Sequence, residues 1–195
     1  MDGLCGGISV IYFITVTIIA VLLGMAGNID TTISILMIGA ILGFLVYNFP
    51  PAKVYMGDTG SNFVGLMIAV TALYGFKLAT FTSLLIPLAI LGSPIIDVLF
   101  SIIRRGLKKK NPFTTPDKEH LHHQLLKMKF STRVSVFLIY IINLLFSAVS
   151  ILYALGDISY AVILYVALMI VFLFIVLKTD ILFPKRKSDN SERED

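Results

Sequence analysis

Residues 48–61, with the sequence NFPPAKVYMGDTGS, form a short polar stretch between two long apolar ones. The stretch contains one carboxylate, Asp58, which stands between Gly57 and the pair Thr59 and Gly60. Small residues let backbone amides approach a ligand closely, and a charged side chain beside a membrane span is costly and is a functional candidate. Asp58 is therefore a candidate for binding a metal ion or a phosphate group. The alternative is a polar turn that merely joins two helices.

All three histidines of the chain lie together, at His120, His122 and His123. Pro116 and Asp117 precede them as a plausible helix start, and on a helix His120 and His123 would share one face. Two histidines and a carboxylate could bind zinc, but zinc-binding pairs more often have the spacing H-x-x-x-H. Histidine can also donate to phosphate oxygens or relay a proton. The remaining alternative is an interfacial helix that simply carries polar side chains.

Basic residues cluster just before these histidines, at Arg104, Arg105 and residues 108–110. Arginine can bind phosphate through two parallel hydrogen bonds, so the cluster favours an anionic ligand. The alternative is that the cluster sets the orientation in the membrane and contacts lipid headgroups. Two acids are further candidates, because Asp2 is flanked by glycine at a helix entrance and Asp97 follows a Ser-Pro pair within an apolar segment.

The composition places these residues in a membrane protein. Of the 195 residues, 57% are hydrophobic and 14% are charged, and the mean hydropathy is +0.90. Soluble proteins are about 45–50% apolar and about 25% charged. The net charge of +4 does not indicate nucleic acid, because the basic residues lie beside apolar segments, where anionic lipid explains them. Cys5 is the only cysteine, which excludes an intrachain disulfide.

The sequence predicts an all-α, polytopic membrane helical bundle of about six spans, each near the roughly 20 residues that cross a bilayer. The expected spans are residues 8–24, 33–47, 60–75, 79–103, 134–155 and 160–177. A basic loop that contains the histidines is expected at 104–133, and a charged, disordered tail at 178–195. Pro87 and the sequence GSP at 92–94 predict a kink in the fourth span.

The basic residues also predict the orientation of the bundle. With six spans, every Lys and Arg except Lys77 lies on one side of the membrane, and the positive-inside rule makes that side cytoplasmic. Asp2, Asp58 and the histidine loop would then face the same compartment. Any chemistry is expected at that cytoplasmic face.

Three segments resemble one known family: NFPPAKVYMGDTGSNFVG from Asn48, SPIIDVLFSIIRR from Ser93 and PDKEHLHHQLL from Pro116. They are similar to the polyprenyl-phosphate N-acetylhexosamine-1-phosphate transferases (glycosyltransferase family 4). The nearest likeness is to the bacterial undecaprenyl-phosphate GlcNAc-1-phosphate transferases that start teichoic acid, O-antigen or related glycopolymers. The resemblance covers residues 1–177. It implies that a lipid phosphate attacks the β-phosphate of a UDP-sugar at the cytoplasmic face of the bacterial cell membrane and releases UMP.

The same resemblance implies a cofactor and the roles of individual residues. The cofactor would be Mg²⁺, with Mn²⁺ as an alternative, bound by Asp58, since Mg²⁺ needs only one or two protein carboxylates besides substrate phosphate. Asp58, His120 and His123 would be catalytic. The residues expected to contact substrate are Asn48, Gly57, Thr59, Gly60, Ser61, Arg104, Arg105, Asp117, His122 and Asp2.

The chain departs from the family at its front. Residues 2–4, Asp-Gly-Leu, resemble the end of a repeated Asp-Gly motif, and the aspartate pair that family members carry earlier has no counterpart. We therefore expect a C-terminal part of the enzyme, whose partner would be an N-terminal half chain or a second copy. Two alternatives remain. One is a non-catalytic fragment that binds lipid or an intact homologue, and the other is a transporter, which would need more polar residues within its spans.

Overall fold

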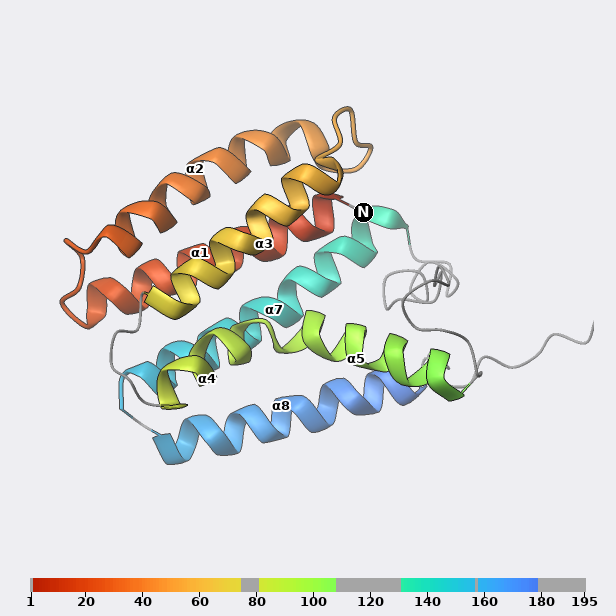
Figure 1. Ribbon diagram of the computed structural model, residues 1–195. Coiled ribbons are helices and arrows are strands. Elements are labelled where there is room, and N and C mark those ends of the chain that lie inside the picture. The colour runs from red at the N-terminus through yellow and green to blue at the C-terminus, as the bar shows by residue number, and fades with distance from the viewer. Residues whose placement is uncertain (1, 75–80, 108–130, 157, 179–195) are drawn as a thin grey trace, which may run out of the picture.

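The computed structural model describes residues 2–74, 81–107, 131–156 and 158–178, and all secondary structure in these ranges is helical (Figure 1). The helices are α1 (Asp2–Leu22), α2 (Ile29–Asn48), α3 (Gly57–Tyr74), α4 (Phe81–Ile90), α5 (Gly92–Leu107), α7 (Thr132–Ala154) and α8 (Ile158–Lys178). The predicted all-α fold class is confirmed for these ranges.

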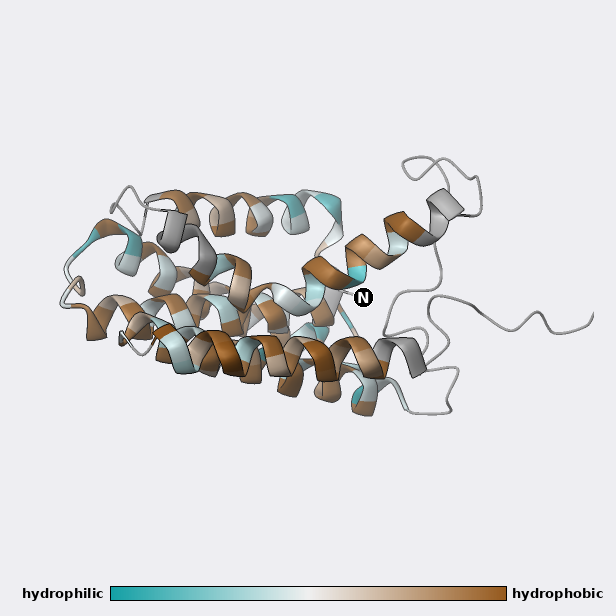
Figure 2. Ribbon diagram, turned by 90° about the horizontal axis from the view of Figure 1, so that it is seen from below, coloured by the Kyte–Doolittle hydropathy of each residue, from teal (hydrophilic) through white to brown (hydrophobic). Residues whose placement is uncertain are grey.

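Four of the described helices are long and apolar enough to cross a membrane: α1, α2, α7 and α8. Figure 2 shows apolar residues along these helices, with polar ones gathered toward the helix ends. Many large apolar side chains point outward, among them Val46 and Tyr160, which are each 76% exposed. An outer surface of this kind suits contact with lipid chains.

The expected third and fourth spans differ from these four. Helix α3 begins with the polar sequence GDTGSN, which lowers its hydropathy below that of a membrane span. The expected fourth span is divided into α4 of 10 residues and α5 of 16 residues, at the place where Pro87 and the sequence GSP predict a kink. The predicted number of about six spans is not confirmed by the four long apolar helices of the described residues.

Several described helices extend beyond the expected spans, because polar residues do not end a helix. Helix α1 begins at Asp2, well before residue 8. Helix α5 continues to Leu107, so Arg104 and Arg105 belong to a helix rather than to a loop. Arginine and leucine are strong helix formers, and a change from apolar to basic composition does not stop a helix. Likewise, α7 begins at Thr132, after Ser131, whose hydroxyl accepts a hydrogen bond from the Val134 amide at 3.4 Å.

Helices α4 and α5 together make one pass through the bundle, and the other successive helices run in opposite directions, so alternate connections lie at the same end of the bundle (Figure 1). One end holds the start of α1, the loop 49–56 between α2 and α3, the end of α5 and the start of α7. We call it the motif end. Asp2 and Asp58 both lie there, as the alternation of spans predicts.

Helix α1 lies at the centre of the bundle and contacts α2, α3, α4 and α7. Its side chains Tyr12 and Phe13 are fully buried. Polar contacts join it to other helices, among them those from the Tyr12 hydroxyl to Thr71 on α3 at 3.4 Å and from Thr15 to Ser147 on α7. Interhelical hydrogen bonds of this kind hold membrane helices together where burial of apolar surface supplies little driving force.

Candidate functional site

The loop 49–56 folds back against the end of α2. Asn48, the last residue of that helix, is 1% exposed, and its Nδ2 group donates to the Val54 carbonyl. The Lys53 amide donates to the Tyr47 carbonyl at 2.9 Å. The buried Asn48 Oδ1 has no hydrogen-bond partner among the described residues. An unpaired buried acceptor costs about 1–3 kcal/mol, so a ligand or water that donates to this oxygen would stabilise the loop.

Asp58 stands in the first turn of α3 and is exposed. Gly57 precedes it with φ of 65°, a left-handed conformation that favours glycine. The Ser61 hydroxyl donates to the Asp58 carbonyl at 3.1 Å, within the same turn. The amide groups at the start of a helix carry partial positive charge, and the Asp58 carboxylate in the same turn is open to solvent. The turn can therefore present both a metal ligand and anion-binding amides.

Gly60 is required by packing rather than by backbone conformation. A Cβ atom at this position would overlap Cγ of Met56, the last loop residue before α3. Met56 in turn packs against the central apolar core of the bundle. Glycine thus lets Met56, at the end of the loop, pack closely against the first turn of α3. This contact fixes the position of the turn that carries Asp58.

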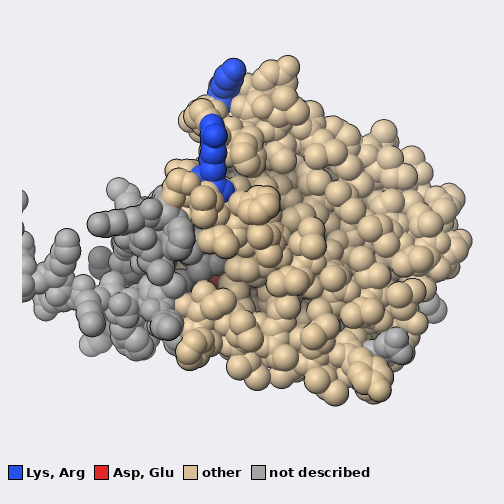
Figure 3. All heavy atoms as spheres, turned by 180° about the vertical axis from the view of Figure 1, so that it is seen from behind, with Lys and Arg blue, Asp and Glu red and all other residues tan. Residues whose placement is uncertain are grey.

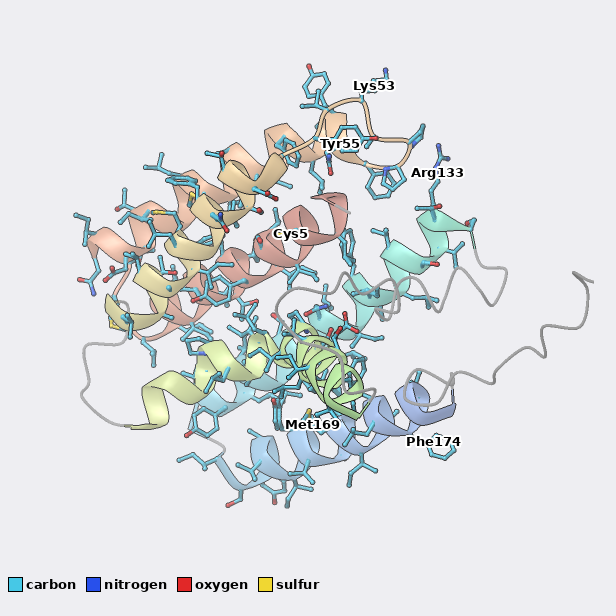
Figure 4. The ribbon with its side chains drawn as sticks, turned by 45° about the vertical axis from the view of Figure 1, so that its right-hand side comes forward. Cys5, Lys53, Tyr55, Arg133, Met169 and Phe174 are labelled. Atoms are coloured by element: carbon cyan, nitrogen blue, oxygen red, sulfur yellow. The ribbon has the colours of Figure 1, made fainter. Side chains whose placement is uncertain are left out.

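Arg133, in the first turn of α7, donates from Nε to the Pro50 carbonyl at 3.0 Å. Figure 4 shows Lys53, Tyr55 and Arg133 around the same loop. Among the residues whose side chains the structure describes, Lys53 and Arg133 are the Lys and Arg residues, and Figure 3 shows their charges on one edge of the molecule. Sequence reasoning counted Arg133 only as a topological charge, because no motif marks it.

The predicted site residues divide into two groups. The structure brings together Asn48, Gly57, Asp58, Thr59, Gly60 and Ser61 at the motif end. The other predicted residues are not tested by side-chain geometry. His120, His122, His123 and Asp117 lie outside the described residues, and for Asp2, Arg104 and Arg105 the structure describes only the backbone, which is helical.

Within the described residues no three His, Cys, Asp or Glu side chains gather to hold a metal ion. The exposed carboxylate of Asp58 nevertheless fits Mg²⁺ as that ion is bound in phosphoryl-transfer sites, through one or two carboxylates, several waters and substrate phosphate.

Residues 1–76 match the model of the family described as Glycosyl transferase family 4. The probable undecaprenyl-phosphate N-acetylglucosaminyl 1-phosphate transferase of Bacillus subtilis is 46% identical over 148 residues, which are 75% of this chain and 40% of that protein. The decaprenyl-phosphate N-acetylglucosaminephosphotransferase of Mycolicibacterium smegmatis is 35% identical, over 72% of this chain and 39% of that protein. No solved structure matches.

A more distant relative is the undecaprenyl-phosphate alpha-N-acetylglucosaminyl 1-phosphate transferase of Escherichia coli, which is 30% identical over 78% of this chain and 42% of that protein. The chain thus spans about two fifths of the length of the relatives it matches. Their names agree with the resemblance carried by the stretch from Asn48 to Ser61. Residues 1–76 therefore belong to glycosyl transferase family 4, and the Bacillus subtilis relative extends the similarity to 75% of the chain.

Proposed function

We propose that this chain is the part of a polyprenyl-phosphate N-acetylglucosamine-1-phosphate transferase that supplies the Asp58 turn. The reaction would transfer GlcNAc-1-phosphate from UDP-GlcNAc to undecaprenyl phosphate and release UMP. The observation that supports this best is the fixed loop at the motif end. Asn48 and Arg133 hold that loop from two helices, so it delivers an exposed carboxylate at a helix start where a diphosphate could bind.

Phosphoryl transfer needs positioning and charge neutralisation more than it needs covalent chemistry from the protein. The Asp58 carboxylate would bind the cation that accompanies the diphosphate, and Mg²⁺ bound there would neutralise charge on the transferred phosphoryl group. The first amides of α3 would donate to phosphate oxygens. Asn48 Oδ1 would accept a hydrogen bond from the nucleotide or from a water held beside it.

The contact of Arg133 with the loop supports a shared role for the two predicted motifs. The segment with the histidines ends just before α7, and Arg133 in the first turn of α7 bonds to the loop that leads to Asp58. From His123 to Arg133 the chain can extend about 35 Å at most. This length allows the histidines to contact a diphosphate at Asp58. We propose His120 and His123 as catalytic residues there, with His122, Asp117, Arg104 and Arg105 as substrate contacts.

We also propose that the motif end faces the cytoplasm of a bacterial cell. Lys53 and Arg133 lie at that end among the described side chains, and positively charged residues beside spans favour the cytoplasmic side. UDP-sugars reach a membrane enzyme from this compartment. The product would feed a cell-wall or surface glycopolymer such as teichoic acid or lipopolysaccharide.

The test joins this chain to the front part of the Bacillus subtilis relative, because the chain matches only 40% of that protein. Membranes containing the fusion are incubated with UDP-GlcNAc, undecaprenyl phosphate and Mg²⁺, and UMP release is measured beside membranes with this chain alone. We expect the fusion to release UMP. The release should stop when EDTA removes the metal and should return when Mg²⁺ or Mn²⁺ is added back. A fusion that inserts at normal abundance but releases no UMP would favour a non-catalytic fragment.

A further inference from the structure

The helical path breaks between α4 and α5. Helix α4 ends at Ile90 and α5 begins at Gly92. Hydrogen bonds continue on both sides, from the Leu91 amide to the Pro87 carbonyl and from the Ile95 amide to the Leu91 carbonyl, each at 3.0 Å. Pro94 has no amide hydrogen, so the Ile90 carbonyl loses the partner that a continuous helix would provide. The break is therefore a defined joint, at which the direction of α5 needs another constraint.

The constraint comes from α7. Asn143 Nδ2 donates to the Ser93 hydroxyl at 3.2 Å, and its second proton goes to the Ile139 carbonyl at 2.9 Å. Asn143 is 1% exposed and Ser93 is 2% exposed. The contact is thus sealed from water, in apolar surroundings where a polar side chain would otherwise lack a partner. Ser93 lies in the first turn of α5, so the bond acts directly at the joint.

Close packing at Gly92 holds the joint from a second side. A Cβ atom at Gly92 would lie 3.0 Å from the Tyr165 hydroxyl of α8 and 3.3 Å from the Phe146 ring of α7. The two rings meet edge to face, with centroids 5.5 Å apart. The joint therefore lies in a corner that α7 and α8 form, and Asn143 supplies a directional contact to the first turn of α5 there.

We propose that Asn143 is a positioning residue, which fixes through Ser93 the direction in which α5 leaves the joint. Figure 4 shows α5 nearly along its axis while α4 lies across the view, so the change of direction is large. Helix α5 ends at the motif end and carries Arg104 and Arg105 there. The effect on turnover rests on the proposed function, in which these arginines contact substrate. The effect on the direction of α5 does not depend on it.

The direct test measures a distance in the full chain. With Cys5 changed to serine, spin labels are attached at Val46→Cys on α2 and Ile103→Cys on α5, because these side chains are 76% and 50% exposed. Ile103 lies about 17 Å beyond Gly92 at about 1.5 Å per residue, so a change of about 20° at the joint moves the label by about 6 Å. Electron-spin distance measurements in bilayers resolve such a shift.

Ser93→Ala removes only the acceptor of the bond, and Asn143→Ala removes its donor. We expect each variant to shift or broaden the distance distribution between the labels. The double variant should show no larger change than either single variant. Ser150→Ala is the matched control, since the Ser150 hydroxyl is equally buried on α7 but donates within its own helix, to the Phe146 carbonyl at 2.9 Å. The control should match the parent. An unchanged distribution in Ser93→Ala, or an equal change in Ser150→Ala, would overturn the proposal.

A kinetic measurement separates this inference from the proposed function. In the active fusion, Ser93→Ala and Arg104→Ala should each lower kcat/KM for UDP-GlcNAc, and combining them should cost no more than Arg104→Ala alone. If Ser93→Ala moves α5 while kcat/KM stays at the parent value, Asn143 positions α5 as proposed, and the assignment of Arg104 and Arg105 to the substrate site is wrong.

Discussion

Arg133 and Pro50, 83 positions apart in the chain, are joined by a hydrogen bond of 3.0 Å from the guanidinium Nε to the loop carbonyl. The bond connects the first turn of α7 to the loop that leads into the Asp58 turn. A cation at this place both holds the loop and leaves its other N–H groups available to an anion. The predictions below follow from how this loop and its neighbours are fixed.

Asp58→Asn should abolish UMP release in the fusion while leaving its abundance in the membrane unchanged, because the amide keeps the shape of the carboxylate but binds a hard cation poorly. Asp30→Asn is the matched control, since Asp30 lies in the first turn of α2 at the opposite end of the bundle. UMP release is measured at several Mg²⁺ concentrations. Release at the parent rate in Asp58→Asn would remove Asp58 from the site.

Arg133→Gln should weaken the hold on the loop 49–56 by about 0.5–1 kcal/mol, a discounted value because the bond is exposed. We expect faster cleavage of the loop by added protease and a several-fold lower kcat/KM. Arg133→Lys keeps the charge but cannot reproduce the planar guanidinium, so its cleavage rate and kcat/KM should lie between those of the parent and of Arg133→Gln. Lys53→Ala is the control, and if it accelerates cleavage as much as Arg133→Gln does, charge alone explains the effect.

Gly60→Ala should destabilise the protein by about 1 kcal/mol and reduce turnover, because the new methyl group overlaps Met56 and pushes the loop away from α3. Gly65→Ala, on the same helix, meets no atom within 4 Å and should stabilise the protein by up to about 1 kcal/mol through helix propensity. Thermal unfolding in detergent measures both. If overlap is the cause, adding Met56→Ala to Gly60→Ala should restore the stability and the turnover. No recovery in this double variant would contradict the explanation.

Asn48→Asp should be more harmful than its small change in shape implies. The carboxylate cannot donate to the Val54 carbonyl, and it would be buried at a position that is 1% exposed. Loss of a buried hydrogen-bond partner costs about 1–3 kcal/mol, so we expect a lower unfolding temperature together with loss of UMP release. Ser34→Ala is the control, because it changes another buried polar group of α2 that has no hydrogen-bond partner among the described residues. It should leave turnover intact, and an equal loss in both variants would mean that the Asn48 effect is not specific to the loop.

The sequence was enough to predict that the chain is helical and that Asp2 and Asp58 lie at the same end of the bundle. Both predictions depend on the length of apolar segments and the order of the loops, which are properties of local composition. The sequence was also enough to find the Asp58 turn, whose small residues have a conformational reason at Gly57 and a packing reason at Gly60. It did not predict where Arg104 and Arg105 stand, because charged residues extend a helix as readily as they end one. That prediction assumed a loop, and α5 continues past both residues.

Contacts between distant residues were beyond the reach of sequence patterns. Nothing around Arg133 distinguishes it from the other basic residues of its segment, and only the packing of α7 beside the loop gives it a partner in Pro50. The same holds for Asn143, one of several polar residues in a largely apolar helix, whose partner Ser93 only the fold reveals. Each of these two side chains acts through a partner that is distant in the sequence and becomes a neighbour only in the folded chain.

The contact between Thr15 and Ser147 has a consequence for how the protein is made. The two residues are 132 positions apart, so at about 5–20 residues per second the ribosome needs roughly 7–26 s to deliver the second after the first. During that wait the Thr15 hydroxyl is not exposed unpaired to lipid, since it donates to the Ile11 carbonyl of its own helix at 2.7 Å. Its oxygen remains available to accept from Ser147. Helix α1 can thus enter the membrane before α7 without an unpaired Thr15 hydroxyl, and Thr15 can still bind Ser147 when α7 is inserted.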